Sequence, residues 1–456
     1  MIEQYQAVYL LGIGGIGMSA LARWFIANGF RVGGYDLTRS TLTQDLESEG
    51  IEIHYTDLGE NLPDVYKTKQ TLVIVTPAVP QDHAELNFFR NNGFDVKKRA
   101  EVLGMLTQSY FTIAVAGTHG KTTTSSMVAH ILKESGKNVF AFIGGITKNY
   151  NSNLLLGNSA LGDQIMVVEA DEYDRSFLKL FPNMAIVTTM DADHLDIYGS
   201  EKQVEESFND FASQVATNGF IACRAGMPLV NPAKGQKLIY FGETTGDVQA
   251  ENIQVKNGAF EFDIAGDKEA QNFRLQLPGR HNVMNALAAY AVARELGVES
   301  QTIKSALATY SGVKRRFELV CSTKNVTYID DYAHHPTEIE ATLSAAKELY
   351  PGKKLTVVFQ PHLFSRTRDF MKEFAQSLSL ADQVVLLPIY PAREKPIEGI
   401  TSDVVLESIT SAEKMICPKE NLMEVVKSLK TDILITMGAG DIDRFVEPIK
   451  LYLNHA

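Results

Sequence analysis

A lysine between glycines and threonines could bind phosphate: residues 117–124 read Gly-Thr-His-Gly-Lys-Thr-Thr-Thr. Backbone N–H groups in a glycine turn can point at a phosphate, Lys121 can neutralise its charge, and a threonine hydroxyl can hold Mg²⁺. The position six residues before Lys121 is Val115 rather than glycine, so the general phosphate-loop pattern is only partly matched. The segment predicts a nucleotide phosphate site, and an ordinary strand-to-helix turn with a surface lysine is the alternative.

Acidic residues follow two later apolar runs. Residues 169–172 read Glu-Ala-Asp-Glu, and residues 193–196 read Asp-His-Leu-Asp. Carboxylates at a strand end beside a phosphate loop are suited to a Mg²⁺ ion that also binds phosphate oxygens, and His194 is a possible further ligand. Solvated acidic turns and a structural histidine are the alternatives.

A second glycine-rich turn lies near the start of the chain. Gly12, Gly14 and Gly17 follow an apolar run in the Gly-x-Gly-x-x-Gly pattern, and Asp36 follows the next predicted strand. This arrangement is typical of a dinucleotide or uridine diphosphate site, although tight packing of a helix on a strand also selects glycine. Thr76 ends another predicted strand in a loop that we expect to face the ligand.

These residues must be positioned by alternating strands and helices. Apolar, β-branched runs predict strands that precede each glycine turn, and helix-compatible segments begin after the turns. Strand-like runs continue this pattern at 51–55, 72–76 and 94–97, whereas short alternating strands over 236–277 predict a small antiparallel appendage. In open α/β sheets ligands bind beyond the carboxyl ends of the strands, so the polar loops should converge there.

The final part of the chain has the same strand-then-polar-cluster pattern. Adjacent Arg315 and Arg316 mark a basic junction suited to phosphate contacts, with a solvated turn as the alternative. Polar clusters at 330–336, 360–368 and 390–395 follow further predicted strands. At about 150 residues per domain, the length of 456 residues predicts three domains.

Composition restricts the class of protein. The formal net charge of −12 argues against a nucleic-acid partner, and three widely separated cysteines indicate neither a disulfide framework nor a cysteine zinc site. Glu3 stands where a signal peptide would carry positive charge, and 18 apolar residues never run together. We therefore expect a soluble cytoplasmic protein without a membrane partner.

Seven ordered motifs resemble those of the Mur ligases, the ATP-dependent amide ligases of peptidoglycan precursor synthesis. They are residues 117–123, 169–172, 193–196, 278–282, 315–317, 330–336 and 360–362. The match covers nearly the whole chain. Within the family, residues 12–19, His119 and residues 330–336 most resemble the members that join L-alanine to UDP-N-acetylmuramate.

The resemblance implies an α/β protein of three domains. The expected domains are an N-terminal Rossmann-like domain for the UDP-sugar (1–108), a central P-loop ATPase-like domain with the antiparallel appendage (109–312), and a C-terminal Rossmann-like domain (313–456). It implies ATP and Mg²⁺ as cofactors, with two ions and with Mn²⁺ as a substitute. UDP-N-acetylmuramate and L-alanine are the implied substrates, and we expect a monomer or weak homodimer.

The resemblance also implies roles for individual residues. The catalytic set is Lys121, Glu169, His194 and Arg316, and the metal ligands are Thr122, Glu169 and His194. The ATP contacts are Gly117, Thr118, His119, Gly120, Lys121, Thr122, Thr123, Asn282, Asn285, Arg316 and Asp331. The UDP-sugar contacts are Gly12, Gly14, Gly15, Gly17, Asp36, Thr76 and His119. The amino-acid contacts are Tyr332, His334 and Arg366, and this chain has Leu363 where the family pattern often has arginine.

Three other functions remain open at this point. A ligase that adds a preformed peptide to the same sugar nucleotide, as in muropeptide recycling, shares most of these motifs. A nicotinamide oxidoreductase built on residues 12–17 would leave Lys121, Glu169 and His194 without a role. A nucleotide-gated binding protein would bind ATP without covalent chemistry.

Overall fold

The computed structural model describes residues 2–158, 162–191, 198–228, 235–392, 394–411 and 413–455. These residues form two compact units, and each is considered by itself. The first unit contains Met1–Glu251, Ile264–Gln271 and Met284–Thr309, and the second contains Asn252–Asp263, Asn272–Val283 and Tyr310–Ala456.

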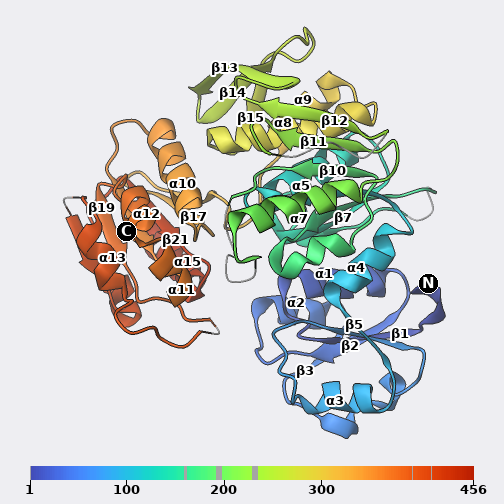
Figure 1. Ribbon diagram of the computed structural model, residues 1–456. Coiled ribbons are helices and arrows are strands. Elements are labelled where there is room, and N and C mark those ends of the chain that lie inside the picture. Colours follow the sequence, from blue (N-terminus) through green and yellow to red (C-terminus); the bar gives the residue numbers. More distant parts are fainter. Residues whose placement is uncertain are drawn as a thin grey trace. The chain divides into compact units, whose positions relative to one another are not determined.

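The first sheet of unit 1 is fully parallel and follows the order β3-β2-β1-β4-β5 (Figure 1, blue to cyan). All five residues of the central strand β1 are buried, as expected for a parallel strand covered on both faces. The strands are β1 (Ala7–Leu11), β2 (Arg31–Tyr35), β3 (Glu52–His54), β4 (Thr71–Val75) and β5 (Asp95–Lys98). The helices are α1 (Ile16–Ala27), α2 (Thr41–Ser48), α3 (Ala84–Asn91) and α4 (Arg99–Thr107).

The lysine turn is carried by a ten-stranded sheet, of which seven strands lie wholly in unit 1 in the order β8-β7-β9-β6-β10-β11-β12, and the next strand (Val248–Lys256) pairs parallel to β12. Helix α5 packs against this sheet and is buried along most of its length. The strands are β6 (Phe111–Ala116), β7 (Val139–Thr147), β8 (Ser152–Leu155), β9 (Ile165–Ala170), β10 (Met184–Val187), β11 (Phe220–Arg224) and β12 (Lys237–Gly242). The helices are α5 (Lys121–Glu134), α7 (Glu201–Ser213) and α9 (Ser300–Thr309).

The predicted antiparallel appendage over 236–277 is wrong for its first strand. Strand β12 runs parallel to β11, with Lys237 opposite Phe220, and so extends the main sheet. Antiparallel pairing occurs in unit 2, between β14 (Ala259–Ile264) and β15 (Phe273–Leu275). Short alternating strands do not encode the direction of pairing, which is decided by the tertiary partner. Strand β13 (Val248–Lys256) and helix α8 (Arg280–Glu295) each contribute residues to both units.

The main sheet of unit 2 has the order β16-β17-β21-β18-β19-β20 (Figure 1, orange to red). Only β16 is antiparallel to its neighbour, and the other described pairs are parallel. The strands are β16 (Glu318–Ser322), β17 (Thr327–Asp331), β18 (Leu355–Phe359), β19 (Gln383–Leu386), β20 (Glu413–Ile416) and β21 (Ile433–Met437). The helices are α10 (Pro336–Leu349), α11 (Phe364–Asp369), α12 (Met371–Leu378), α13 (Ser402–Ser408), α14 (Leu422–Ser428) and α15 (Val446–His455).

Three largely parallel sheets with flanking helices confirm the α/β class predicted from the sequence. The predicted domain boundaries near residues 108 and 312 stay predictions. Within the described ranges, no helix combines the length and the apolar character needed to cross a membrane.

Candidate functional site

The lysine turn connects β6 to α5 through two glycines in the left-handed region, Gly117 at φ 137° and Gly120 at φ 84°. A Cβ atom on Gly117 would lie 1.9 Å from Thr188 Oγ1, and one on Gly120 would lie 2.7 Å from Asn285 Oδ1. A side chain is therefore excluded at Gly117 by backbone conformation and by space, because backbone N–H groups also lie within 3.0 Å, and a side chain at Gly120 is disfavoured by its positive φ. The turn ends at the N-terminus of α5, where the N–H groups of the first helical turn and the helix dipole favour an anion.

Lys121 is held at the base of this turn by protein oxygens. Its Nζ donates to Gly117 O at 2.6 Å, to Thr118 O at 3.2 Å, and to both carboxylate oxygens of Glu172 at 2.7 and 3.0 Å. The side chain of Lys121 is 16% exposed and that of Glu172 is 5% exposed, so this is a nearly buried ion pair.

The electrostatic environment keeps Lys121 protonated. Burial works to lower the pKa of Lys121, but the nearby carboxylates, Glu172 first, outweigh it and raise that pKa above its ordinary value. Burial also raises the pKa of the Glu172 carboxyl to about 7, against the opposing effect of Lys121. Because Glu172 is almost fully buried, its charge depends on the lysine that it contacts.

Hydrogen bonds to the residues that follow β10 fix the rest of the turn. The His119 N–H donates to Thr189 Oγ1 at 2.8 Å, and the Thr118 hydroxyl donates to Asp191 O at 3.1 Å. His119 Nε2 lies 3.2 Å from Asp191 Oδ2. The two predicted ATP contacts Thr118 and His119 are thus anchored to a neighbouring strand end, as expected for a preformed loop.

Two of the three predicted metal ligands lie in the described structure, while His194 lies outside the described residues. Thr122 is buried in the first turn of α5, and Glu169 is half-buried near the end of β9. The Ser125 hydroxyl links these elements, since it donates to Thr122 O at 3.1 Å and to Glu169 Oε1 at 3.4 Å. Glu169 Oε1 also accepts the Gly144 N–H at 2.6 Å. A hydroxyl and a carboxylate beside a phosphate loop fit the oxygen ligands that Mg²⁺ prefers.

The two predicted asparagines fall in different compact units, although both lie on α8. Asn285 belongs to unit 1, is 7% exposed, and lies next to Gly120. Asn282 belongs to unit 2, where its Nδ2 donates to Pro278 O at 2.6 Å. The structure therefore brings Asn285 to the phosphate loop. Thr123, which follows Thr122 in α5, is also buried.

The first glycine turn brings Asp36 and Thr76 together with Gly12 and Gly14. The Gly14 N–H donates to Asp36 Oδ2 at 2.8 Å. A Cβ atom on Gly12, at φ 83°, would lie 2.3 Å from Thr76 Cγ2. Gly15 caps the N-terminus of α1. The predicted UDP-sugar residues of this turn are thus neighbours in space.

Arg99 was not predicted from the sequence, yet it connects this turn to the acidic segment after β9. A Cβ atom on Gly17 would come within 2.5 Å of Arg99 Nη1, and Arg99 Nη2 lies 3.2 Å from Asp171 Oδ2. Arg99 begins α4, far from Gly17 and Asp171 in the sequence, and no local pattern pointed to it. Only the tertiary fold shows that this arginine lies beside the glycine turn.

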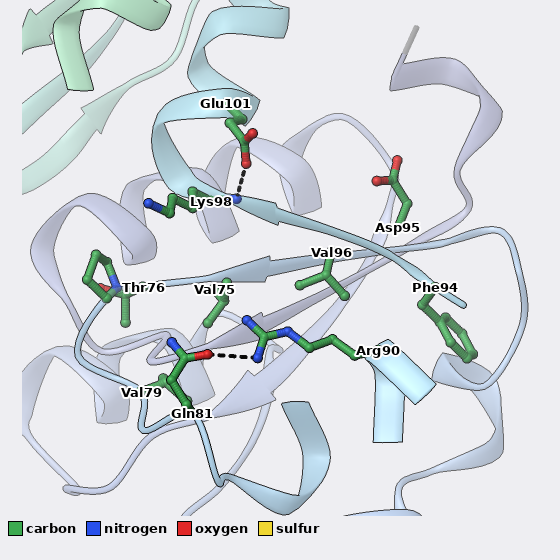
Figure 2. Close-up of a pocket in the computed structure, with 11 residues that line it drawn as sticks. Val75, Thr76, Val79, Gln81, Arg90, Phe94, Asp95, Val96, Lys98 and Glu101 are labelled. Carbon is green, nitrogen blue, oxygen red and sulfur yellow. Dashed lines mark hydrogen bonds between the residues drawn. The ribbon is translucent and has the colours of Figure 1, made fainter. Parts of the chain in front are cut away.

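A pocket of about 510 Å³ runs along the edge strand β5, from Phe94 and Asp95 to Lys98, and reaches the carboxyl end of β4 at Val75 (Figure 2). Thr76 lines it, together with Arg90 and Lys98. Figure 2 shows Arg90 donating to Gln81 at 2.9 Å across one side of the pocket. Thr76 itself follows the carboxyl end of β4, which is the edge at which open α/β sheets bind ligands, and this position supports Thr76 as a ligand-facing residue.

In unit 2 the arginine pair and the two aspartates form one cluster. Arg315 Nε lies 3.0 Å from Asp330 Oδ2, and Arg315 and Arg316 both lie over the Tyr332 ring, 5.3 and 5.1 Å from its centroid. Asp331 accepts the N–H groups of Phe317 and Ala333, each at 2.7 Å. Burial raises the pKa of Asp330 to about 6, against the opposing effect of Arg315. Through its bond to the Phe317 N–H, Asp331 holds the backbone directly after the two arginines.

The predicted amino-acid residues also lie in unit 2. His334 and Tyr332 have ring centroids 5.1 Å apart, and His334 Nδ1 lies 3.2 Å from a carboxylate oxygen of Glu338. Arg366 is 7% exposed on α11. Leu363, immediately before α11, has φ 72°, an unusual conformation for a branched side chain. Backbone strain of this kind is often found at functional sites.

Comparisons with known proteins match the chain from end to end. The family models that match are "Mur ligase family, catalytic domain" over residues 7–111, "Mur ligase middle domain" over 115–293, and "Mur ligase, glutamate ligase domain" over 315–440. These matches confirm the predicted three-domain organisation.

Full-length relatives and solved structures agree with those matches. A UDP-N-acetylmuramate--L-alanine ligase from Cytophaga hutchinsonii is 53% identical over 99% of this chain and 97% of its own. One of the same name from Flavobacterium johnsoniae is 48% identical over 99% of both chains. The crystal structure of a UDP-N-acetylmuramate-alanine ligase from Thermotoga maritima is 30% identical, with a TM-score of 0.82, over 99% of this chain and 100% of that one. A murein peptide ligase from Psychrobacter arcticus is 27% identical, with a TM-score of 0.69, over 99% and 98%. The chain belongs to the Mur ligase family.

Proposed function

We propose that this chain joins L-alanine to the lactyl carboxylate of UDP-N-acetylmuramate and converts ATP to ADP and phosphate. The observation that carries the proposal is the 53% identity, across 99% of the chain, to a relative named for that reaction. The phosphate loop supports it, because a lysine beside the N-terminus of α5 is an arrangement suited to a nucleotide phosphate.

In the first step, a lactyl carboxylate oxygen attacks the γ-phosphorus of ATP. The bond between this phosphorus and the oxygen that bridges it to the β-phosphorus breaks. The products are an acyl phosphate and ADP. This step needs in-line positioning and neutralisation of negative charge rather than a protein nucleophile. We assign these tasks to Lys121 and to the N–H groups of the turn from Gly117 to Gly120.

In the second step, the neutral amine of alanine attacks the acyl carbonyl. The C–N bond forms, phosphate leaves with the carbonyl–oxygen bond electrons, and the leaving phosphate accepts the proton that the nitrogen loses. We assign the alanine site to Tyr332, His334 and Arg366, with the guanidinium of Arg366 pairing with the amino-acid carboxylate. Arg316, Asn282 and Asp331 are proposed ATP contacts from the same unit.

Thr122 and Glu169 would hold Mg²⁺, with His194 as a further ligand. The ion supplies positive charge where phosphate and carboxylate oxygens crowd together. We propose that two ions bind. We also propose that Mn²⁺ can replace Mg²⁺, because a donor set of hydroxyl, carboxylate and imidazole accepts either metal. Ser125 and the Gly144 N–H orient Glu169 for this role.

The UDP-sugar is assigned to the first glycine turn and its neighbours. We propose contacts from Gly12, Gly14, Gly15, Gly17, Asp36 and Thr76, with His119 reaching the sugar nucleotide from the phosphate loop. A monomer or weak homodimer in the cytoplasm, where both nucleotides are available, completes the proposal.

An ADP-release assay tests the function directly. Purified full-length protein is given ATP, Mg²⁺ and UDP-N-acetylmuramate, then L-alanine, glycine, L-serine, or the tripeptide that a muropeptide ligase would use. We expect alanine to give the largest stimulation and a product heavier than the sugar nucleotide by one alanyl residue. Stimulation by the tripeptide alone would favour the peptide-adding alternative, and stimulation by neither would overturn the proposal.

A further inference from the structure

The segment after β9 places Glu172 against the phosphate-loop lysine with little freedom to move. The Tyr198 hydroxyl donates to Glu172 O at 2.6 Å, and the Arg175 N–H donates to the same oxygen at 2.9 Å. Asp174 and Arg175 both have φ 52°, a left-handed conformation that is unfavourable for a residue other than glycine. A tight, partly strained turn therefore fixes the backbone of Glu172.

Asp171 anchors the same turn from its other end. The Tyr173 N–H donates to Asp171 Oδ1 at 3.1 Å, and the Phe177 N–H donates to Asp171 O at 2.8 Å. Arg99 holds Asp171 Oδ2 at 3.2 Å. The backbone at Glu172 is thus held by contacts on both sides of the turn.

The contacts of Lys121 show what this carboxylate does. An ammonium has three N–H donors, and Nζ of Lys121 is directed at Gly117 O, Thr118 O and the Glu172 carboxylate. The two carbonyl acceptors are neutral, so Glu172 is the charged group in direct contact with Nζ. A nearly buried ammonium without such a partner would be strongly destabilised.

We propose that Glu172 is a positioning residue of the ligase reaction, whose fixed carboxylate holds the charged Lys121 at the base of the phosphate loop. This inference rests on the proposed function. In this proposal Glu172 acts through Lys121 and not by contact with any of the three substrates. Its effect should therefore appear in turnover, when Lys121 exchanges one of its protein acceptors for an oxygen of the transferring phosphoryl group, and not in binding of the sugar nucleotide.

The main test compares Glu172→Gln with wild-type protein in the alanine-dependent ADP-release assay. We expect kcat to fall about 100-fold, as for a small misplacement of a catalytic group. The KM for UDP-N-acetylmuramate should stay unchanged. Asp174→Asn is the matched control, because this carboxylate lies two residues away but is 56% exposed and pairs with Lys98 at 3.6 Å. Wild-type turnover in Glu172→Gln would overturn the inference.

A double-mutant cycle separates positioning from a general structural role. If Glu172 acts only through Lys121, adding Glu172→Gln to Lys121→Met should not slow the residual reaction further. An equal fractional loss in both backgrounds would show that Glu172 acts elsewhere and would contradict the inference.

Tyr198→Phe provides a second variant should Glu172→Gln fail to fold. It removes one hydroxyl that fixes the Glu172 backbone and should lower kcat by less than Glu172→Gln, again without a change in the sugar-nucleotide KM. Unchanged turnover in this variant would count against a positioned carboxylate. A wild-type protein without alanine-dependent ADP release would instead overturn the proposed function.

Discussion

The two glycine turns of unit 1 follow the same strand-turn-helix plan but carry opposite charge. In the first turn a carboxylate, Asp36, accepts the Gly14 N–H at 2.8 Å. In the second an ammonium, Lys121, donates to the turn carbonyls Gly117 O and Thr118 O. The first turn thus has a carboxylate, a hydrogen-bond acceptor, beside its N–H groups, and the second turn has an ammonium, a hydrogen-bond donor, beside its carbonyl groups.

This difference would allow one backbone motif to serve the two ligands that we propose. A turn with a cation at its base suits a transferring phosphate, on which negative charge must be neutralised. A turn with a carboxylate suits hydroxyl and N–H groups of a nucleoside, which are hydrogen-bond donors. Glycine spacing alone does not distinguish them, whereas the charged side chain within reach of each turn does.

Lys121→Ala should have the largest effect of these variants, because it should reduce ligation strongly and leave sugar-nucleotide binding nearly unchanged. Ligation should fall by at least about 10³-fold, because the cation of the second turn is lost, while affinity for UDP-N-acetylmuramate should change little. Steady-state turnover and calorimetric binding of the sugar nucleotide measure the two effects. An equal loss of both would show that the turns do not serve separate ligands.

Stability must be controlled in that experiment, because Lys121→Ala leaves the Glu172 carboxylate buried without its partner. Removing one member of a buried ion pair costs about 3–5 kcal/mol. The double variant Lys121→Ala with Glu172→Gln should regain much of that stability but none of the activity. Recovery of activity would mean that Lys121 serves only to neutralise Glu172.

Gly117→Ala should break the second turn by space rather than charge. The added methyl group would meet Thr188 Oγ1 at 1.9 Å and Thr189 N at 2.9 Å, so the loop must shift and ligation should be nearly lost. Gly136→Ala is the matched control, since Gly136 has φ 78° with nothing within 4 Å of the added Cβ. The control should lose only about 1–2 kcal/mol of unfolding free energy. Equal loss of ligation in both variants would contradict this prediction.

The sequence predicted these turns because glycine patterns and apolar strands are local features. Their neighbours Asp36, Thr76 and Glu169 were also predicted, since parallel strands bring polar residues to one sheet edge. Glu172 lies within the acidic run 169–172, for which the sequence predicts a metal site, but the sequence does not show which carboxylate of this run contacts Lys121. That choice depends on the turn at Asp174 and Arg175, whose positive φ values no composition rule predicts.

Other features depended wholly on tertiary contacts. Arg99 lies beside Gly17 only because α4 packs near the first turn, and the parallel pairing of β12 depends on its neighbour β11. Roles that require the two units together, such as those of Arg316 and Arg366 toward ATP and alanine, stay predictions.

Asp36→Asn should weaken the first turn selectively. Asparagine keeps one acceptor but loses the charge that holds the Gly14 N–H, so the KM for the sugar nucleotide should rise about tenfold, equivalent to about 1.4 kcal/mol. The KM for ATP should not change. Asp64→Asn is the control. The Asp64 side chain is 98% exposed, and its Oδ1 forms a surface ion pair with Lys67 Nζ at 3.2 Å. A parallel rise in both Michaelis constants would show that Asp36 supports the fold rather than one ligand.

The smallest expected effect is a pH dependence of stability that arises at the second turn. Burial raises the pKa of Glu172 to about 7 from an ordinary value of 4.5, so the folded state binds its proton more tightly than the unfolded state does. This contribution to stability is complete below pH 4.5 and is lost as pH rises through about 7. The raised pKa of Lys121 has its effect above pH 10.5, outside this range.

Unfolding in denaturant, followed by fluorescence of Trp24, the one tryptophan of the chain and a core residue of unit 1, measures the change. Glutamine cannot ionise, so the unfolding free energy of Glu172→Gln should fall less between pH 5 and pH 8 than that of the wild type. Identical slopes would show that Glu172 is already ionised at pH 5, and that Lys121 stabilises its charge more than burial opposes it.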